Sequence, residues 1–308
     1  MSTVRVFAPA SVANLGCGFD VLGLALDEVG DILEMTVSEG SGISIMNRTD
    51  VPLPEDIEQN VITPVIRKFF AMTGLSGRVD VTVCRKIYPG SGIGSSAASS
   101  VAAAFGMNEL FGQPLPMKDL VVCAMEGENL ASGGYHADNA APSMMGGIVL
   151  IRGYEPLDLI PLPVPGDFYC TVAHPEIVVS TKAARGVLPA AVPLHDAVTQ
   201  WGNVGGLVAG LFTGDVGLVG RAMKDVVAEP YRKRFIPGFD DLREKILSEG
   251  AMAFNISGAG PSVFALSGSR ETAVRAGALM KAHFTALGIG CNLYVTKVAE
   301  QGARVLAQ

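Results

Sequence analysis

The order of apolar and polar positions along the chain predicts short strands and helices in mixed order. Residues 78–85 alternate valines with polar side chains, which is the period of a strand with one buried face. Residues 95–110 and 117–130 have the length and spacing of helices. The same reasoning predicts strands over 3–7, 31–38, 42–46, 147–151, 168–173, 252–256, 262–266 and 291–298, and helices over 60–72, 181–188, 196–213, 216–227, 240–248 and 272–287. Because strands and helices intermix without a regular βαβ repeat, the predicted fold class is α+β.

The segments between these elements predict loops and one domain boundary. Residues 8–20 and 133–142 are expected to be loops, and the strand over 42–46 is expected to pair with the strand over 31–38. Residues 153–166 carry four prolines, which punctuate a chain rather than continue a helix or a central strand. A chain of 308 residues is long enough for two domains. We therefore predict an N-terminal domain over 1–153 and a C-terminal domain over 154–308.

Composition and charge argue against several classes of partner. A formal net charge of −7, with no cluster of Lys and Arg, is unfavourable for binding nucleic acid or anionic lipid. The sequence contains no run of about 20 apolar residues that could cross a membrane, and its start does not resemble a signal peptide. Five widely spaced cysteines without a Cys-x-x-Cys pair argue against a zinc knuckle and are typical of a reducing compartment. We expect a cytoplasmic protein that binds neither nucleic acid nor membrane.

A glycine- and serine-rich segment between a predicted strand and a predicted helix is the strongest candidate for a ligand site. It reads Pro89, Gly90, Ser91, Gly92, Ile93, Gly94, Ser95, Ser96, Ala97, Ala98. Alternate glycines let the backbone approach a ligand, and the free N–H groups at the start of a helix attract an anion such as phosphate. Ser95 and Ser96 can cap that helix and offer hydroxyls to phosphate or Mg²⁺. The alternative interpretation is a flexible turn with a serine cap.

This segment fits neither of the two commonest phosphate-binding motifs and resembles a third. It lacks the Gly-Lys-Ser/Thr of a Walker A loop and the spacing of the dinucleotide fingerprint. The pattern P-x-x-x-G-[IL]-G-S-S-A resembles the nucleotide-binding motif of the GHMP kinases, which include galactokinase, homoserine kinase, mevalonate kinase and phosphomevalonate kinase. Residues 255–262 resemble that family's C-terminal Gly-rich motif, which packs beside the phosphate loop. Residues 8–20 resemble its first motif in the form that homoserine kinases carry.

Three segments resemble the substrate-binding parts of the homoserine kinases in that family. They are residues 135–143, with the pattern His-x-Asp-Asn-x-x-Pro, residues 180–185 and residues 229–232. Homoserine is a zwitterion, so its carboxylate favours a guanidinium and its ammonium favours carboxylate or amide oxygens. The candidate substrate-binding residues are Asn14, Asp20, His136, Asp138, Thr181, Arg185 and Arg232. Taken alone, either arginine is equally compatible with a solvated surface charge, and His136 with a structural hydrogen bond.

The resemblance also implies which residues hold the nucleotide and the metal. It places the family's Mg²⁺-binding glutamate at Glu128, with the Ser96 hydroxyl as its partner. It places Asn60 beside the adenine, and Gly258 and Gly260 beside the phosphate loop. The alternative for Glu128 is a carboxylate on a helix surface.

Four residues are implied to act at the reacting groups, namely Ser96, Glu128, Asp138 and Asn139. Asp138 either accepts the proton of the substrate hydroxyl or holds the substrate ammonium while Asn139 orients the hydroxyl. The resemblance to homoserine kinases favours the second role.

As a whole, the resemblance implies a two-domain kinase. The N-terminal domain is expected to be similar to the second domain of ribosomal protein S5, with a left-handed βαβ crossover, and the C-terminal domain to be ferredoxin-like. The expected reaction transfers the γ-phosphoryl group of ATP to the side-chain hydroxyl of L-homoserine, giving O-phospho-L-homoserine for threonine biosynthesis. The expected cofactors are ATP and Mg²⁺. The expected assembly is a homodimer, which is typical of the relatives. The alternatives are a GHMP kinase acting on shikimate or mevalonate, and a non-catalytic regulatory protein with this fold.

Overall fold

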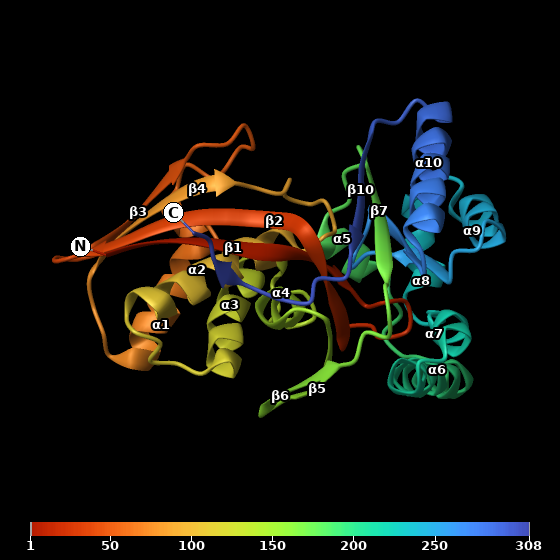
Figure 1. Cartoon of the computed structure of the whole chain (residues 1–308), viewed down its shortest axis with the longest axis horizontal. Helices are drawn as coiled ribbons and strands as arrows, with labels where there is room; N and C mark the ends of the chain where they lie inside the picture. The colour runs from red at the N-terminus through yellow and green to blue at the C-terminus, as the bar shows by residue number, and fades with distance from the viewer. Residues whose placement is uncertain (1, 308) are drawn as a thin grey trace.

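The structure, a computed structural model, describes residues 2–307, with the side chains of Thr181 and Lys182 outside the description. Its two halves are each built on one sheet, and they lie side by side along the long axis of the molecule (Figure 1). None of the helices within 2–307 combines the length and the apolar character that a membrane crossing demands. The mixture of helices with two separate sheets confirms the predicted α+β class.

The first half contains a seven-stranded sheet. Its main path runs β11–β1–β2–β4–β3, and the hairpin of β5 and β6 extends the far end of β2. The bounds are Ser2–Ala13 for β1, Leu22–Ser38 for β2, Gly42–Asn47 for β3, Arg78–Arg85 for β4, Ile148–Tyr154 for β5, Leu157–Leu162 for β6 and Arg304–Val305 for β11. All neighbours pair antiparallel except β3 and β4, which are parallel. The expectation that 42–46 pairs with 31–38 was therefore wrong, because the chain crosses over through a helix before it returns as β4.

Four helices cover one face of this sheet (Figure 1). They are α1 (Ile62–Thr73), α2 (Ser95–Leu110), α3 (Met117–Ser132) and α4 (Ala140–Met145), and a short 3₁₀ turn, η1 (Ile57–Gln59), precedes α1. Helix α2 lies between the sheet and its neighbouring helices, and most of its residues are buried. Its many Ala and Ser side chains suit this place, because small residues let the backbones approach one another. The inward valines of β4, Val79, Val81 and Val83, belong to the same core.

The second half contains a four-stranded antiparallel sheet in the order β10–β7–β9–β8. Its strands are β7 (Tyr169–Pro175), β8 (Ala253–Ile256), β9 (Val263–Ser267) and β10 (Cys291–Lys297). The helices are α5 (Thr181–Gly186), α6 (Leu194–Thr213), α7 (Val216–Ala222), α8 (Glu229–Arg232), α9 (Phe239–Ser248) and α10 (Arg270–Ala286), with a 3₁₀ turn, η2 (Lys233–Phe235). In chain order the strands are the fourth, first, third and second, which is the ferredoxin-like order that the family resemblance implied.

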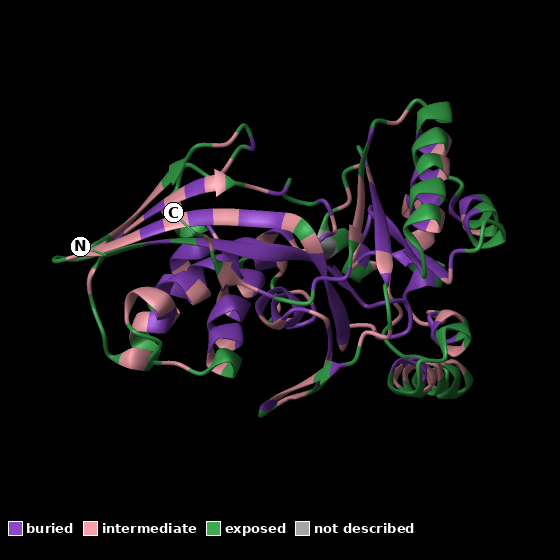
Figure 2. Ribbon diagram, in the orientation of Figure 1, coloured by how far each residue is buried: buried purple, intermediate pink, exposed green. Residues whose placement is uncertain are grey.

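The two halves share an apolar core. One buried cluster contains Leu22 and Leu24 of β2 together with Val172 of β7 and Leu266 of β9. Figure 2 shows the buried residues continuing from the middle of β1 and β2 to the inner strands of the second sheet. The chain also returns to the first sheet at its end, where β11 pairs with β1. The division into two domains stays a proposal. The boundary predicted between residues 153 and 154 falls inside β5, which pairs with β6 in the first sheet, so we now place it after Leu162.

Three further expectations from the sequence need correction. Residues 8–13 are strand rather than loop, because a register shift between Pro9 and Ser11 lets β1 keep a proline. Residues 140–142 already belong to α4. The helix expected over 216–227 ends at Ala222, because the Asp225 carboxylate accepts the N–H groups of residues 227–229 and starts α8.

Candidate active site

A single cavity of about 440 Å³ brings together residues from both halves of the molecule. Its walls include the loop after β1, the glycine-rich loop before α2, the end of α3, the segment before α4, α5, α8 and the Gly-rich turn between β8 and β9. These candidate residues line it: Asn14, Asp20, Asn60, Pro89, Gly90, Gly92, Gly94, Ser95, Ser96, Glu128, His136, Asp138, Asn139, Arg185, Arg232, Gly258 and Gly260. Segments that are far apart in the sequence therefore meet where the resemblance implied a common site.

The glycine-rich loop adopts a conformation that only glycine accepts easily. Gly92 and Gly94 have φ values of +76° and +67°, in the left-handed region. A Cβ atom on Gly92 would lie 2.9 Å from the carbonyl oxygen of Gly260, and one on Gly94 would lie 2.1 Å from Oγ of Ser11. The loop leads directly into α2, whose first turn therefore opens toward the cavity. Free N–H groups of this turn, at the positive end of the helix dipole, suit a phosphate group.

Two serine hydroxyls of the C-terminal half form hydrogen bonds to the backbone of this loop. The Ser257 hydroxyl donates to the carbonyl oxygen of Gly92 at 2.6 Å, and the Ser262 hydroxyl donates to that of Ser91. On the other side, the N–H of Ser11 donates to the carbonyl oxygen of Ile93 at 3.1 Å. The motif at 255–262 thus packs beside the glycine-rich loop, as expected, while phosphate binding by that loop stays a prediction. Ser91, Ile93, Ala97 and Ala98 are buried behind the cavity wall and support the loop instead of lining the cavity.

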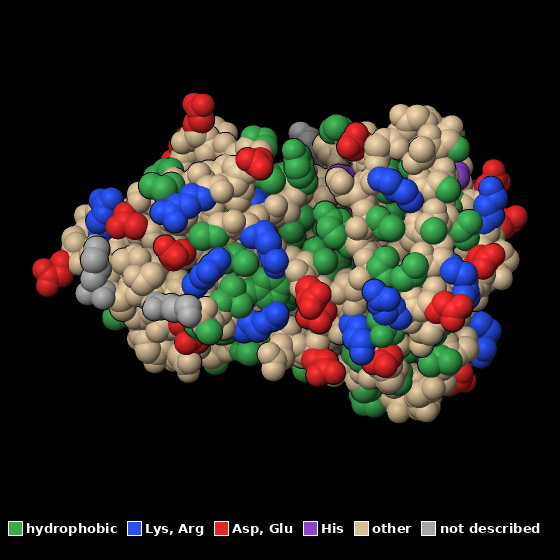
Figure 3. All heavy atoms as spheres, turned by 45° about the horizontal axis from the view of Figure 1, so that its top comes forward, with side chains coloured by type: hydrophobic (Ala, Val, Ile, Leu, Met, Phe, Trp, Pro, Cys, Tyr) green, Lys and Arg blue, Asp and Glu red, His purple; other side chains and the backbone are tan. Residues whose placement is uncertain are grey.

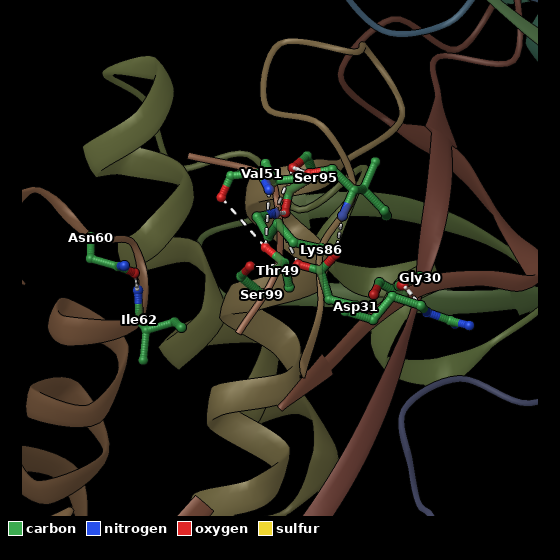
Figure 4. A network of polar contacts seen from close by, with 12 residues as sticks. Gly30, Asp31, Thr49, Val51, Asn60, Ile62, Lys86, Ser95 and Ser99 are labelled. Atoms are coloured by element: carbon green, nitrogen blue, oxygen red, sulfur yellow. Dashed lines mark hydrogen bonds and ion pairs between the residues drawn. The ribbon is translucent and has the colours of Figure 1, made fainter. Parts of the chain in front are cut away.

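The serine cap expected at α2 is absent from the described contacts. Gly94 occupies the N-cap position, and α2 has no side-chain cap hydrogen bond. The Ser95 hydroxyl instead donates to the carbonyl oxygen of Ile87 at 2.8 Å and accepts a hydrogen bond from the Lys86 ammonium at 2.6 Å. Figure 4 shows this group of side chains at the start of α2. Both Ser95 and Ser96 line the cavity, but the Ser95 hydroxyl is already engaged by Lys86 and Ile87.

Glu128, on α3, has an unpartnered oxygen where the resemblance implied a metal. The residue is buried, and its Oε1 atom has no hydrogen-bond partner among the described residues. Burial raises the pKa of Glu128 to about 7, and a hydrogen bond from Ser96 and the charge of Lys86 oppose that rise. Within residues 2–307, no group of three or more His, Cys, Asp or Glu side chains is arranged to hold a metal alone. One carboxylate and one hydroxyl fit Mg²⁺, which takes its remaining ligands from water and substrate phosphates.

Asp138 and Asn139 lie just before α4 and face the same cavity. Asn139 is oriented by the Ser11 hydroxyl, which donates to its Oδ1 atom at 2.9 Å. Burial raises the pKa of Asp138 to about 7, and the nearby carboxylates of Asp20 and Glu128 add to this effect. A carboxyl group with a pKa near 7 is partly ionised at physiological pH. It can therefore bind a cation or accept a proton.

Asp20, His136 and Arg185 form a hydrogen-bonded cluster at the cavity. Nη1 and Nη2 of Arg185 donate to the two carboxylate oxygens of Asp20, each at 3.1 Å. Nη2 of Arg185 also lies 3.2 Å from Nε2 of His136. Because a guanidinium only donates, this Nε2 is the acceptor and the imidazole proton lies on Nδ1. Burial lowers the pKa of His136, consistent with a neutral ring.

Arg232, in α8, is buried beside this cluster. Its Nε and Nη1 atoms donate to the backbone carbonyl oxygens of Ala184 and Gly258 at 3.2 and 3.0 Å. The guanidinium carbons of Arg232 and Arg185 lie 5.1 and 5.6 Å from the ring centroid of Phe19. One aromatic ring thus supports both cations. The structure brings the two arginines together, as the substrate hypothesis requires.

Two other candidates differ from what was expected of them. The Asn14 carboxamide accepts from the N–H of Asp20 at 3.0 Å and donates to the carbonyl oxygen of Gly258 at 3.1 Å. Asn14 therefore joins the motif at 8–20 to the motif at 255–262. These two hydrogen bonds explain its position without a role as an ammonium ligand. The side chain of Thr181 lies outside the described residues.

Asn60 lies at the part of the cavity that offers apolar contact. Its Oδ1 atom accepts from the N–H of Ile62 at 3.1 Å (Figure 4), and Leu53, Pro54 and Val61 line the cavity with it. Such a mixture of apolar side chains and an amide suits a planar base.

Sequence reasoning missed several side chains that shape the site. They are Ser11, Phe19, Asp31, Lys86, Ser99 and Tyr154, and the Tyr154 hydroxyl donates to the carbonyl oxygen of Asp20 at 2.8 Å. Ser11 and Phe19 lie inside the first motif, which was the available signal. Nothing in the local sequence around Asp31, Lys86 or Tyr154 distinguishes them from ordinary strand residues.

Comparisons with known proteins agree with this geometry. Two family models together match more than half of the chain. They are GHMP kinases N terminal domain over residues 60–147 and GHMP kinases C terminal over residues 207–286. A homoserine kinase of Chlorobium phaeobacteroides is 44% identical over 320 residues, covering 99% of this chain and 100% of that protein. The chain belongs to the homoserine kinases of the GHMP kinase family.

Solved structures extend the similarity from sequence to fold. The crystal structure of homoserine kinase from Cytophaga hutchinsonii matches with a TM-score of 0.94 and 47% identity, covering 99% of this chain and 98% of that one. The L. major mevalonate kinase, solved in complex with R-mevalonate, matches with a TM-score of 0.73 at 16% identity. The second match shows a shared fold alone, so the substrate has to be argued from the side chains at the cavity.

Proposed function

We propose that this chain transfers the γ-phosphoryl group of ATP to the side-chain hydroxyl of L-homoserine, which gives O-phospho-L-homoserine and ADP and serves threonine biosynthesis. Full-length similarity to homoserine kinases supports the proposal. The single observation that carries it is the placement of Asp20, Arg185 and Arg232 in the same cavity as the phosphate-binding loop. These opposite charges match a zwitterionic acceptor, whereas shikimate and mevalonate lack the ammonium.

The nucleotide would bind with its phosphates on the glycine-rich loop. The first-turn N–H groups of α2 are the donors that face the cavity, and Gly92 and Gly94 allow the close approach of the phosphates. The adenine would lie near Asn60 and Val61, where apolar side chains also line the cavity. In this arrangement the γ-phosphate would point toward Asp138 and Asn139, which line the same cavity.

The pair of Ser96 and Glu128 would hold the Mg²⁺ ion. The buried oxygen of Glu128 that has no partner among the described residues is the observation that fits this role. Held by these two side chains, the ion would supply positive charge that offsets the negative charge of the phosphates.

Homoserine would bind by exchanging partners with the Asp20–Arg185 ion pair. Its carboxylate suits the guanidinium groups of Arg185 and Arg232, and its ammonium suits the carboxylates of Asp20 and Asp138. The zwitterion supplies one charge of each sign, so every charged side chain keeps a counter-charge when the substrate enters. Phe19 keeps both guanidinium groups in place during this exchange.

Phosphoryl transfer then depends mostly on alignment. The substrate oxygen forms a bond to the γ-phosphorus, the bond from that phosphorus to the bridging oxygen of ADP breaks, and the hydroxyl proton is released. Asn139, fixed by Ser11, would orient the hydroxyl. Asp138 would hold the ammonium, and its pKa of about 7 also suits the alternative role of accepting the hydroxyl proton.

An ADP-release assay with Mg-ATP tests the proposal directly. Candidate acceptors are L-homoserine, L-serine, L-threonine, shikimate and mevalonate, and Glu128→Ala is the inactive control. Strong turnover on L-homoserine alone, lost in the control, is the expected result. Turnover on a different alcohol would contradict the assignment of Asp20, Arg185 and Arg232, and ATP binding without turnover would favour a regulatory protein.

Two further proposals concern the assembly and its place in the cell. We propose a homodimer, as expected from the resemblance, and a cytoplasmic location. Light scattering of the purified chain checks the first, with a mass twice that of the chain as the expected result.

A further inference from the structure

A buried ion pair lies beneath the start of α2, next to the phosphate-binding loop (Figure 4). The Lys86 ammonium donates to Oδ2 of Asp31 at 2.9 Å, and the exposed fractions of the two side chains are 6% and 0%. The ammonium also donates to the carbonyl oxygen and the hydroxyl of Ser95 at 2.8 and 2.6 Å. All three of its hydrogens therefore have acceptors.

The carboxylate of Asp31 is equally well fixed. It accepts from the Ser99 hydroxyl at 2.6 Å and from the N–H of Ile87 at 2.7 Å, in addition to Lys86. Lys86 lines the cavity, and Asp31 does not. The pair is thus oriented with its positive end toward the cavity and its negative end behind.

The position of this cation runs against the electrostatics of the helix. The N-terminus of a helix carries positive partial charge, so a lysine there is unfavourable for the helix itself. A buried ion pair is also a poor source of stability, because well-packed apolar residues serve as well. Lys86 is thus unfavourable for the local helix and adds little to the stability of the fold. Residues of this kind are expected at functional positions.

The positions of the cationic side chains around the cavity indicate a role for Lys86. Among the described residues that line the cavity, the Lys and Arg side chains are Lys86, Arg185 and Arg232. Both arginines lie over Phe19, at the part of the cavity assigned to homoserine. Lys86 is the one of the three that contacts the first turn of α2, where the phosphates are expected.

We propose that Lys86 supplies fixed positive charge to the phosphates of the bound nucleotide, and that Asp31 and Ser99 are positioning residues that hold it there. This inference rests on the proposed nucleotide site. Because its hydrogens are all used, Lys86 acts through its charge on the phosphates and not as a hydrogen-bond donor to them. Neither the glycine-rich loop nor the following part of α2 contains a lysine between residues 87 and 108, so the charge comes from Lys86, the first residue after β4.

The test compares the affinity of the metal-free chain for ADP and for adenosine by calorimetry. The variants are Lys86→Met, Asp31→Asn, Ser99→Ala and the charge-neutral double variant Asp31→Asn with Lys86→Met. The matched control is Lys297→Met, which removes an exposed lysine that is paired with Asp167 and is not among the residues that line the cavity. Thermal unfolding of each variant reports its stability separately.

The expected result is a loss of about tenfold or more in ADP affinity for Lys86→Met, with adenosine affinity unchanged. Asp31→Asn and Ser99→Ala are expected to lose less, because they loosen the lysine without removing it. The double variant should recover stability relative to the single charge variants, since no buried charge is left unpaired, but it should still bind ADP weakly.

The double variant separates a functional role from a structural one. Recovery of ADP affinity together with stability would overturn the inference, because Lys86 would then serve only the fold. Equal losses for adenosine and ADP would overturn it too. Wild-type chain that binds no ADP would instead overturn the proposed nucleotide site, and the inference with it.

Discussion

The guanidinium of Arg185 and the carboxylate of Asp20 face each other through two hydrogen bonds of 3.1 Å, although 165 positions separate them in the sequence. Asp20 belongs to the loop after β1 and Arg185 to α5, so this pair joins the two halves of the molecule across the cavity. The pair contains the two charges that a zwitterionic substrate needs, already placed opposite each other. It is also half-exposed, so it adds little to stability and can open when the substrate arrives.

Arg185→Lys is predicted to weaken homoserine binding selectively. Lysine keeps the charge but loses the planar fork that fits a carboxylate. We expect the KM for homoserine to rise about tenfold or more, while the KM for ATP stays within about twofold. Steady-state kinetics with each substrate varied in turn measures both. Equal increases of the two KM values would contradict a substrate-specific role for Arg185.

Asp138→Asn distinguishes the two roles considered for this carboxyl group. If Asp138 holds the ammonium, the KM for homoserine rises strongly and kcat stays close to that of the wild type. If it is a general base, kcat falls by about 100-fold or more. We predict the first outcome, and initial-rate measurements at saturating homoserine decide between them.

The stability of the chain is predicted to fall as the pH rises from about 4 to about 7. The pKa of Asp138 is about 7 in the fold, against 3.8 as its ordinary value, and Glu128 is raised in the same direction. Between these values the folded chain binds a proton that the unfolded chain has lost, so the free energy of unfolding decreases with pH. Asp138→Asn removes the contribution of this carboxyl group to the decrease, because the amide does not ionise.

The melting temperature of Asp138→Asn relative to wild type tests this sign. At pH 8 the variant is expected to melt about 2 °C or more above the wild type, and at pH 4 the difference should disappear. Calorimetric scans at the two pH values measure it. A difference that is the same at both would show that the carboxyl group is not held neutral by the fold.

Gly94→Ala is predicted to damage the phosphate loop more than Gly90→Ala. Both glycines have positive φ, so each alanine adds about 1–2 kcal/mol of backbone strain. A Cβ on Gly94 would also meet Ser11 Oγ at 2.1 Å and Asn139 Oδ1 at 2.9 Å, whereas one on Gly90 would meet nothing within 4 Å. Thermal unfolding and ADP affinity measure the difference, and similar losses in both variants would contradict the tight packing at Gly94.

The sequence predicted the local elements well where the pattern was uninterrupted. Helix α2 begins and ends where its composition indicated, and β4 follows its alternating valines. Short elements such as α4 and β6 were missed, because prolines and glycines obscured their pattern. The antiparallel return of β11 to β1 depends on contacts between the two ends of the chain, which no local pattern contains.

The site shows the same division. The glycine-rich loop and Asp138 were candidates because they lie in motifs that resemble those of a known family, and Glu128 was a candidate because the same resemblance places a metal-binding glutamate there. The Lys86–Asp31 pair was not found, because its partners are 55 positions apart and each looks like an ordinary residue at the edge of a strand. The capping role given to Ser95 failed for a related reason, since the sequence did not reveal that a buried lysine would occupy its hydroxyl.

The measurement that tests the central claim most directly is identification of the product by ³¹P NMR after incubation with Mg-ATP and L-homoserine. The account predicts a phosphomonoester signal coupled to the CH₂ group of the former side-chain hydroxyl, formed in equal amount with ADP. A reaction that yields ADP with inorganic phosphate only, or a signal from phosphate on the amine or carboxylate, would contradict it.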